Sequence, residues 1–370
     1  MRRQQRCRSG CGARRRCAAA AGAAPHPGAF TRSKHHRRHR RGGPYRHRLL
    51  RLRSFAASNA QPVPDVIVTI SQRSGTGIPD KTVTTGPEAL SDDVAIACPP
   101  RSYSLDENNR TVLPYAVVDV TAEHEGYDPV HVAGVQVFDG EVSLLELLMI
   151  PVEEDETAAY TVRSLPEDFD IPTHKLFEGG ESSGPTPLSA CRPRILDQPI
   201  IPEKIMVHLG RPSANVQNVT VSFRDYIKNV ASSEVYPTWH VSALRANILA
   251  QVSFALNRVY TEFYPSQGYD FNITASTAYD QKFIKGRNIF ESVSTLVDAL
   301  FTSYLRRPGF AEPLAASFCN GTTSTCDGLS QWGSEHLAQE GYNSVEILQH
   351  YYGENLEIVN NAPIQNIQYS

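Results

Sequence analysis

The sequence of 370 residues has no acidic residue before Asp65 and no long run of apolar residues. Residues 1–64 contain 16 Arg and one Lys, which leaves 19 of the 36 basic residues and all 39 acidic residues to the rest of the chain. No stretch approaches the ~20 apolar residues that a membrane helix needs, so we expect no transmembrane helix. The net charge of -3 therefore conceals a basic head and an acidic body.

Large apolar side chains are almost absent before Leu49, so the head cannot bury a hydrophobic core. We therefore expect residues 1–48 to be disordered. Such a head could bind nucleic acid or tether the protein to an anionic wall polymer, but we favour the simpler interpretation of a dispensable extension. The alanine-rich run at residues 18–24 is too short and too weakly apolar for a signal peptide, so the sequence does not reveal an export route.

Metal-binding patterns are also missing. The seven cysteines form no paired CxxC motifs and the chain has no HExxH motif, so we expect neither a metal site nor a cofactor. Outside the head, Cys319 and Cys326 are the only cysteines close enough in sequence to suggest a local pair. A disulfide between them is expected if the protein is exported and is not expected in the cytosol.

Alternation of apolar and polar residues begins at Leu49 and indicates β-strands. No window between residues 49 and 150 has helical spacing over ten residues. The candidate strands are separated by turns rich in Gly, Pro and Asp, and they lie at residues 49–52, 66–70, 82–85, 115–120, 130–137 and 142–150. This pattern predicts a small antiparallel β-sandwich over residues 49–150.

Three motifs in this region occur in a known order. They are PVPDVIVTI at residues 62–70, TVTTG at residues 82–86 and the GYDP turn at residues 126–129. Together they resemble the carboxypeptidase-regulatory, transthyretin/Ig-like sandwich domains, which implies a binding or spacer module without chemistry of its own. Residues 151–203, which are rich in Pro, Glu, Ser and Gly, are expected to form a linker.

A different periodicity begins after a predicted strand at residues 204–210. Phe223, Ile227 and Val230 follow the i, i+4, i+7 spacing of a helix face. Further helices are predicted at residues 242–260, at 289–304 and from a capping box at Asn343 to Tyr351. Because strands and helices are segregated, we expect an α+β domain over residues 204–358, followed by a tail at 359–370.

Glu234 continues the apolar stripe of the first predicted helix and lies at its C-terminal end. Burial and the partial negative charge of a helix end both disfavour an ionised carboxylate, and so both raise its pKa. A raised pKa suits a general acid that protonates a glycosidic oxygen. Tyr236 and Trp239 could supply an apolar wall or a platform for sugar stacking. Position alone nevertheless favours a simpler interpretation, in which Glu234 is solvated at a helix end.

Several segments, in order, match the motifs of one family. Residues 223–260 are similar to the motifs EYLxGVVASEM and EALKAQAVAARTYAL, and residues 279–283 are similar to a strand with the motif DQVY. Residues 317–321, 328–334 and 338–353 are similar to SSCGG, GMSQYGA and AxxGxxYxEILxHYYPG. The region resembles the SpoIID/LytB family, the stage II sporulation protein D and amidase-enhancer proteins of bacteria.

The resemblance implies a protein of the bacterial cell envelope or spore that acts on peptidoglycan glycan strands. In the SpoIID branch, a lytic transglycosylase cleaves the glycan with one glutamate, and that position falls on Glu234. The carboxyl group would first protonate the leaving oxygen and then accept the proton of the sugar's own 6-hydroxyl, giving a 1,6-anhydro product without a second carboxylate. Gln331 and Trp332 would line the groove with Tyr236 and Trp239, and Ser330 is either a groove residue or a turn residue.

Three departures from the family pattern favour another interpretation. Val252 stands where the family has an arginine, residues 272–277 lack the zinc ligands of some members, and residues 324–327 replace a motif that contains histidine. These losses are expected in a non-catalytic peptidoglycan-binding protein or an amidase enhancer, whose partner would be a cell-wall amidase. Neither interpretation involves nucleic acid.

Overall fold

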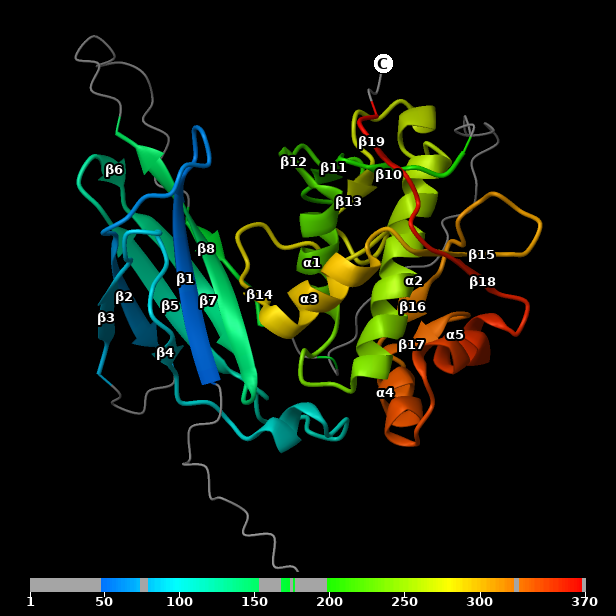
Figure 1. Ribbon diagram of the computed structural model, residues 1–370, viewed down its shortest axis with the longest axis horizontal. Helices are drawn as coiled ribbons and strands as arrows, with labels where there is room; N and C mark the ends of the chain where they lie inside the picture. Colours follow the sequence, from blue (N-terminus) through cyan, green and yellow to red (C-terminus); the bar gives the residue numbers. More distant parts are fainter. Residues whose placement is uncertain are drawn as a thin grey trace, which may run out of the picture. The chain divides into compact units, whose positions relative to one another are not determined.

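A computed structural model describes residues 48–73, 79–152, 168–173, 176, 198–322 and 326–367. Within these ranges the protein is a mixed α/β structure with several sheets and five α-helices (Figure 1). The predicted basic head, except Arg48, and most of the predicted linker lie outside the described residues. None of the helices described is long and apolar enough to cross a membrane.

The first large sheet is built around two strands that pair in parallel. β1 (Arg48–Ala56) pairs with β8 (Glu141–Pro151) along its whole length. Antiparallel neighbours complete this sheet, namely β4 (Val94–Ala95), β6 (Tyr127–Asp128) and β14 (Ile289–Phe290). The prediction of a purely antiparallel sandwich was therefore wrong for β1 and β8. Their long connection, which passes through the other sheet, supplies the crossover that parallel strands need.

The second large sheet has the order β3-β2-β5-β7-β9. Its strands are β3 (Lys81–Thr84), β2 (Ile67–Gln72), β5 (Ala116–Glu123), β7 (Val130–Val137) and β9 (Phe169–Asp170). The first four strands pair antiparallel, as predicted, and β9 is added in parallel to β7. Because β9 comes from the predicted linker, part of that segment belongs to the sheet.

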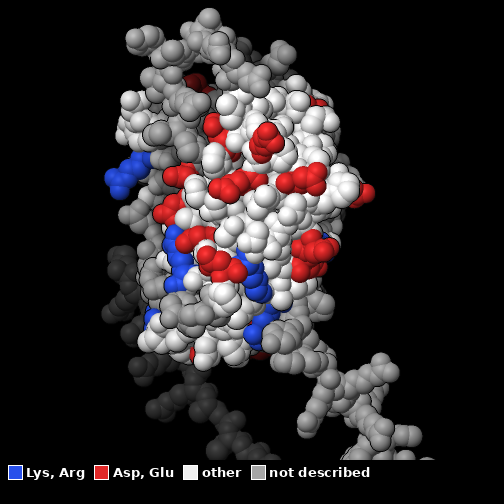
Figure 2. All heavy atoms as spheres, turned by 90° about the vertical axis from the view of Figure 1, so that its left-hand side faces the viewer, with Lys and Arg blue, Asp and Glu red and all other residues white. Residues whose placement is uncertain are grey.

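Both sheets contribute buried side chains to one hydrophobic core. Alternate residues of β1 and β8, such as Leu52 and Leu147, lie in the same cluster as Val68 of β2 and Val120 of β5. Burying each such side chain contributes roughly 1.5–3 kcal/mol, so this shared core holds the sheets face to face. Residues 48–152, which supply most strands of both sheets, make up the β-sandwich. On the face shown in Figure 2, carboxylates are spread over the surface, and most of the visible Lys and Arg side chains lie in its lower part.

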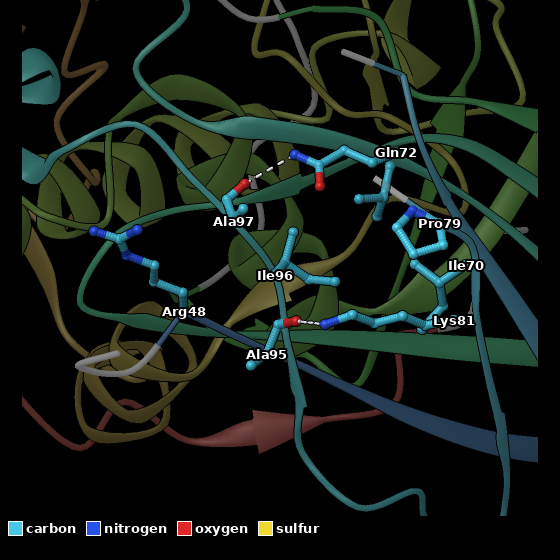
Figure 3. A pocket seen from close by; sticks show the side chains of 9 residues that line it. Arg48, Ile70, Gln72, Pro79, Lys81, Ala95, Ile96 and Ala97 are labelled. Atoms are coloured by element: carbon cyan, nitrogen blue, oxygen red, sulfur yellow. Dashed lines mark hydrogen bonds between the residues drawn. The ribbon is translucent and has the colours of Figure 1, made fainter. Parts of the chain in front are cut away.

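A small cavity of about 160 Å³ opens between the two sheets (Figure 3). Its floor includes Ile70 and Ile96, and its rim carries Gln72 and Lys81. The Gln72 amide donates to the carbonyl oxygen of Ala97 at 2.9 Å, and the Lys81 ammonium donates to the carbonyl oxygen of Ala95. These two rim groups are therefore engaged by the backbone beside β4.

The described part of the C-terminal half contains five α-helices, and four of them were predicted in some form. They are α1 (Phe223–Glu234), α2 (Val241–Tyr260), α3 (Glu291–Leu300), α4 (Gln331–Gln339) and α5 (Ser344–Tyr352). The capping box of α5 is confirmed, because Asn343 and Glu346 bond each other's backbone N–H groups. The third predicted helix, at 289–304, is shorter at both ends. Residues 289–290 pair with β8 as β14, and Tyr304 begins a strand. The helix α4 was not predicted.

Short sheets tie the remaining segments together. β11 (Lys204–His208) lies between β12 (Asn218–Ser222) and β13 (Ile273–Thr274), while β15 (Tyr304–Arg306) pairs with β18 (Glu357–Val359). β10 (Ile201–Pro202) pairs with β19 (Ile364–Gln365), so the end of the predicted linker and the predicted tail form one ladder. Residues 279–283, which were expected to form a strand, instead follow an irregular path.

Candidate active site

The carboxylate of Glu234 lies at the last residue of α1 and receives two hydrogen bonds. The backbone N–H of Lys282 donates to Oε1 at 2.8 Å, and the amide Nε2 of Gln331 donates to Oε2 at 3.2 Å. Protein atoms enclose the carboxylate, although the residue keeps some exposure to solvent. Burial is the largest influence and raises the pKa of Glu234, while the two hydrogen bonds and the nearby Lys282 charge lower it.

The local sequence explains why α1 ends at this carboxylate. Ser222 caps the helix by accepting a hydrogen bond from the N–H of Asp225, and the predicted apolar stripe of Phe223, Ile227 and Val230 is buried. Val235 is extended, and Pro237 follows two residues later, which disfavours helical conformation in the intervening turn. Glu234 is thereby held at the helix end, as predicted.

Gln331 is brought to Glu234 by the start of α4. Ser330 is the N-cap of this helix, and its hydroxyl accepts a hydrogen bond from the N–H of Gly333 at 3.0 Å. The Gln331 side chain is buried beside Glu234. Ser330 was expected to be either a groove residue or a turn residue, and in the structure it caps the helix at a turn. Its contact with saccharide remains a prediction.

A disulfide stands next to the strand that leads into α4. Cys319 and Cys326 are bonded, with their Cα atoms 6.1 Å apart. Cys319 belongs to β16 (Phe318–Cys319), which pairs in parallel with β17 (Leu329–Ser330) so that Cys319 lies opposite Ser330. The bond therefore lies beside the ladder that holds Ser330, the residue before Gln331.

Two buried polar residues just before Lys282 anchor the segment that carries it. The Asp280 carboxylate, which is fully buried, accepts hydrogen bonds from Arg258 at 2.8 Å and from the hydroxyl of Tyr264 at 2.5 Å. The side chain of Gln281 accepts from the Tyr226 hydroxyl at 3.0 Å and donates to the carbonyl oxygen of Gln251 at 3.1 Å. Such bonds offset the cost of burying polar groups and fix the backbone N–H of the next residue against Glu234.

The aromatic residues predicted to bind substrate form a buried cluster. Tyr236, Trp239 and Trp332 are only 2%, 3% and 3% exposed. The two indole rings lie 4.8 Å apart, and the Tyr236 ring lies about 6 Å from each. This burial leaves little ring surface for a sugar to stack on. Their contact with substrate remains a prediction.

Sequence reasoning missed Glu335, a buried carboxylate on the helix that begins at Gln331. It lies one helical turn after Gln331 on α4, and its Oε2 accepts a hydrogen bond from the N–H of His240 at 2.8 Å. Burial raises the pKa of Glu335. The i+4 spacing from Gln331 could have revealed it only if α4 had been recognised. His240 itself caps α2 by accepting from the N–H of Ser242.

Two of the three segments that depart from the motif pattern make structural contacts, and Ser324 and Thr325 of the third segment lie outside the described residues. Val252 is completely buried in α2. Asn272 accepts a hydrogen bond from the N–H of Met206 at 2.9 Å, and Thr274 donates to Asp280. Among the described residues, no group of three or more His, Cys, Asp or Glu side chains is arranged to hold a metal ion.

A cavity of about 630 Å³ adjoins the loop that follows Glu234. Pro237 and Trp239 form one wall, and Arg101 and Glu141 from the β-sandwich form another. Burial raises the pKa of Glu141 to about 7. The cavity thus lies where the β-sandwich meets the loop between α1 and α2.

Comparisons with known proteins do not identify the chain. No protein-family model matches the sequence, and no curated protein matches it. Among solved structures, the TIE protein of Bacillus anthracis has a TM-score of 0.19 at 16% identity, with 28% of this chain and 16% of that chain covered. The 3-chlorocatechol 1,2-dioxygenase of Rhodococcus opacus has a TM-score of 0.19 at 10% identity, with 28% and 59% covered. The catechol 1,2-dioxygenase of Pseudomonas arvilla has a TM-score of 0.19 at 12% identity, with 32% and 56% covered. The chain therefore spans less than two thirds of each of these proteins, and likenesses this weak carry no argument about fold or function.

Proposed function

We propose that this protein is a lytic transglycosylase of the bacterial cell envelope or spore that cleaves peptidoglycan glycan strands. Glu234 is its single acid and base. One contact carries the proposal: the hydrogen bond of 3.2 Å between Gln331 and Glu234. The two residues are 97 positions apart in the sequence and belong to separate motifs. The resemblance had assigned both of them to one site.

The environment of Glu234 suits the first step of this reaction. Burial raises its pKa, so more of the carboxyl group keeps a proton near neutral pH and can deliver it to the leaving glycosidic oxygen. Once ionised, the carboxylate is stabilised by the Lys282 N–H and the Gln331 amide. It then accepts the proton of the sugar's 6-hydroxyl as that oxygen bonds to the anomeric carbon.

A product assay tests this proposal. Purified glycan strands are incubated with the protein, and the fragments are analysed by mass spectrometry. Anhydro-muramyl ends are expected with the wild type and should vanish with Glu234→Gln, which keeps the shape of the side chain but cannot exchange a proton. If no wall preparation yields such ends, the proposal fails.

A second candidate is a non-catalytic peptidoglycan-binding protein that stimulates a cell-wall amidase. Val252, buried at the position of the family's arginine, is the observation in its favour, because it leaves no cation there. This candidate predicts unchanged pull-down by sacculi for Glu234→Gln and no fragments from the wild type. Loss of pull-down on that substitution would count against pure binding.

A further inference from the structure

The loop that follows Glu234, residues 235–240, is bonded to the β-sandwich by three hydrogen bonds from one short helix, η1 (Arg101–Ser104). The hydroxyl oxygens of Ser104 and Thr238 lie 2.7 Å apart, and both residues are completely buried. The indole N–H of Trp239 donates to the carbonyl oxygen of Ser104 at 3.0 Å, and the Arg101 guanidinium donates to the carbonyl oxygen of Thr238. Two consecutive loop residues are thus fixed by the β-sandwich.

A second connection reaches the residue just before Glu234. The hydroxyl of Ser233 accepts a hydrogen bond from Arg287 at 3.0 Å, and the same guanidinium donates to Oε1 of Gln136, on β7, at 3.4 Å. Asn288 exchanges two further hydrogen bonds with the backbone of Gln136, at 2.9 and 3.2 Å. The arrangement links β7 through a buried arginine to the last turn of α1.

Apolar packing closes the same junction. The ring of Phe138, which follows β7, lies 5.6 Å from that of Tyr236 and 5.3 Å from that of Phe290. Tyr115 and Phe138 belong to the hydrophobic core of the helical half and not to that of the β-sandwich. Well-packed cores deform little, so this contact transmits the position of the β-sandwich to the loop.

We propose that the β-sandwich is part of the active site and positions the carboxylate of Glu234, with Ser104 and Gln136 as positioning residues on its two sides. This inference rests on the proposed function for Glu234 as the reacting group. It replaces the expectation of a spacer module. The β-sandwich is connected to the residue before Glu234 and contacts the loop after it, through both polar and apolar groups.

The test compares Ser104→Ala with Ser102→Ala, a matched control in the same short helix whose side chain is exposed. Two quantities are measured: steady-state rates on purified glycan strands, and the titration of Glu234 by NMR in protein labelled at the glutamate carboxyl carbons. The Glu234 signal is assigned with Glu234→Gln. Ser104→Ala should lower kcat roughly 10-fold with little change in KM, and should shift the Glu234 titration midpoint. Ser102→Ala should change neither.

Variants at Thr238 distinguish a specific effect on the position of Glu234 from a general loss of folding. Thr238→Ser keeps the hydroxyl and should behave as the wild type, while Thr238→Val should reproduce the effect of Ser104→Ala. Ser104→Ala also removes the hydrogen bond of 2.7 Å from the Ser104 hydroxyl to the Arg101 carbonyl oxygen. The double variant of Ser104→Ala with Thr238→Val should therefore be no worse than Ser104→Ala alone, because the contact between the two hydroxyls is already lost in that variant. Thr238→Val also serves if Ser104→Ala fails to fold.

The two proposals fail in different ways. A wild type that cleaves no glycan overturns the lytic function, and the NMR titration then decides the inference alone. An unchanged Glu234 titration in both Ser104→Ala and Thr238→Val overturns the positioning role, whatever the activity. A shifted titration in these variants, with none in Ser102→Ala, supports it.

Discussion

The side-chain amide of Gln331 lies 3.2 Å from a carboxylate oxygen of Glu234, and neither residue is near the other in the sequence. The contact joins the C-terminal end of α1 to the first residue of α4. The Glu234 carboxyl group titrates and the Gln331 amide does not. Substitutions at each residue therefore test different properties of the contact.

Removing the Gln331 amide should weaken catalysis without unfolding the protein. In Gln331→Ala the carboxylate loses its donor at Oε2, and we expect kcat/KM on glycan strands to fall roughly 10- to 100-fold. Gln349→Ala, on α5, is the matched control and should keep wild-type rates. Equal rates for all three proteins would show that the contact has no part in the reaction.

The ammonium of Lys282 should influence the pH above which activity is lost, because its charge acts on the pKa of Glu234. Its charge lowers the pKa of Glu234 and so opposes the effect of burial. Lys282→Met keeps the backbone N–H bond but removes the charge, so the pKa should rise and activity should persist to higher pH. The pH profile of kcat/KM measures this shift. Lys285→Met is the control. If the alkaline limb of the pH profile stays in place or moves to lower pH in Lys282→Met, Glu234 is not the acid that sets this limb.

Ionisation of Glu234 should destabilise the folded protein as the pH rises. Its raised pKa means that the folded protein holds this proton more tightly than the unfolded chain, so stability falls as the pH rises through the interval between the two pKa values. Glu234→Gln does not titrate, and its gain in Tm over the wild type should be larger at about pH 8 than at about pH 4. Thermal melts at both pH values check this, with the exposed Glu340→Gln as control. A gain that does not depend on pH would be inconsistent with a buried carboxylate.

The disulfide should stabilise the protein and hold the start of α4. Cys319 and Cys326 are separated by seven positions, and closing so short a loop contributes about 2 kcal/mol. Replacing both with serine should lower the free energy of unfolding by this amount in denaturant titrations. It should also lower kcat, because Cys319 lies opposite Ser330 in the ladder of β16 and β17, and Gln331 follows Ser330. Cys98→Ser, which removes a free cysteine of the described β-sandwich, is the control. An unchanged stability after both replacements would mean that the loop is held without the bond.

Local patterns predicted the elements whose residues carry their own signal. The spacing of Phe223, Ile227 and Val230 placed α1 and put Glu234 at its end. Alternating residues located β2, β5, β7 and β8 within a few positions. These features depend on periodicity along one segment, which a single sequence contains.

Features that depend on distant partners were not predictable in this way. The parallel pairing of β1 with β8, and the pairing of residues 289–290 with β8, depend on the fold and not on either strand alone. The helix α4 was obscured by Gly333, an unfavourable residue in a helix interior. A Cβ atom at this position would lie 2.0 Å from the Tyr351 hydroxyl, so a larger residue would force that side chain to move. Without α4, neither Glu335 nor the contact of Gln331 with Glu234 could be derived from spacing.

The most direct test of the central claim is cleavage of glycan strands in water enriched in heavy oxygen. If Glu234 directs the sugar's own 6-hydroxyl to the anomeric carbon, the new ends are anhydro-muramyl residues, one water lighter than hydrolysed ends, and they carry no heavy oxygen. Glu234→Gln should give none of them. New reducing ends that carry heavy oxygen would show hydrolysis by water, and unchanged product formation by Glu234→Gln would show that this carboxylate is not the acid and base.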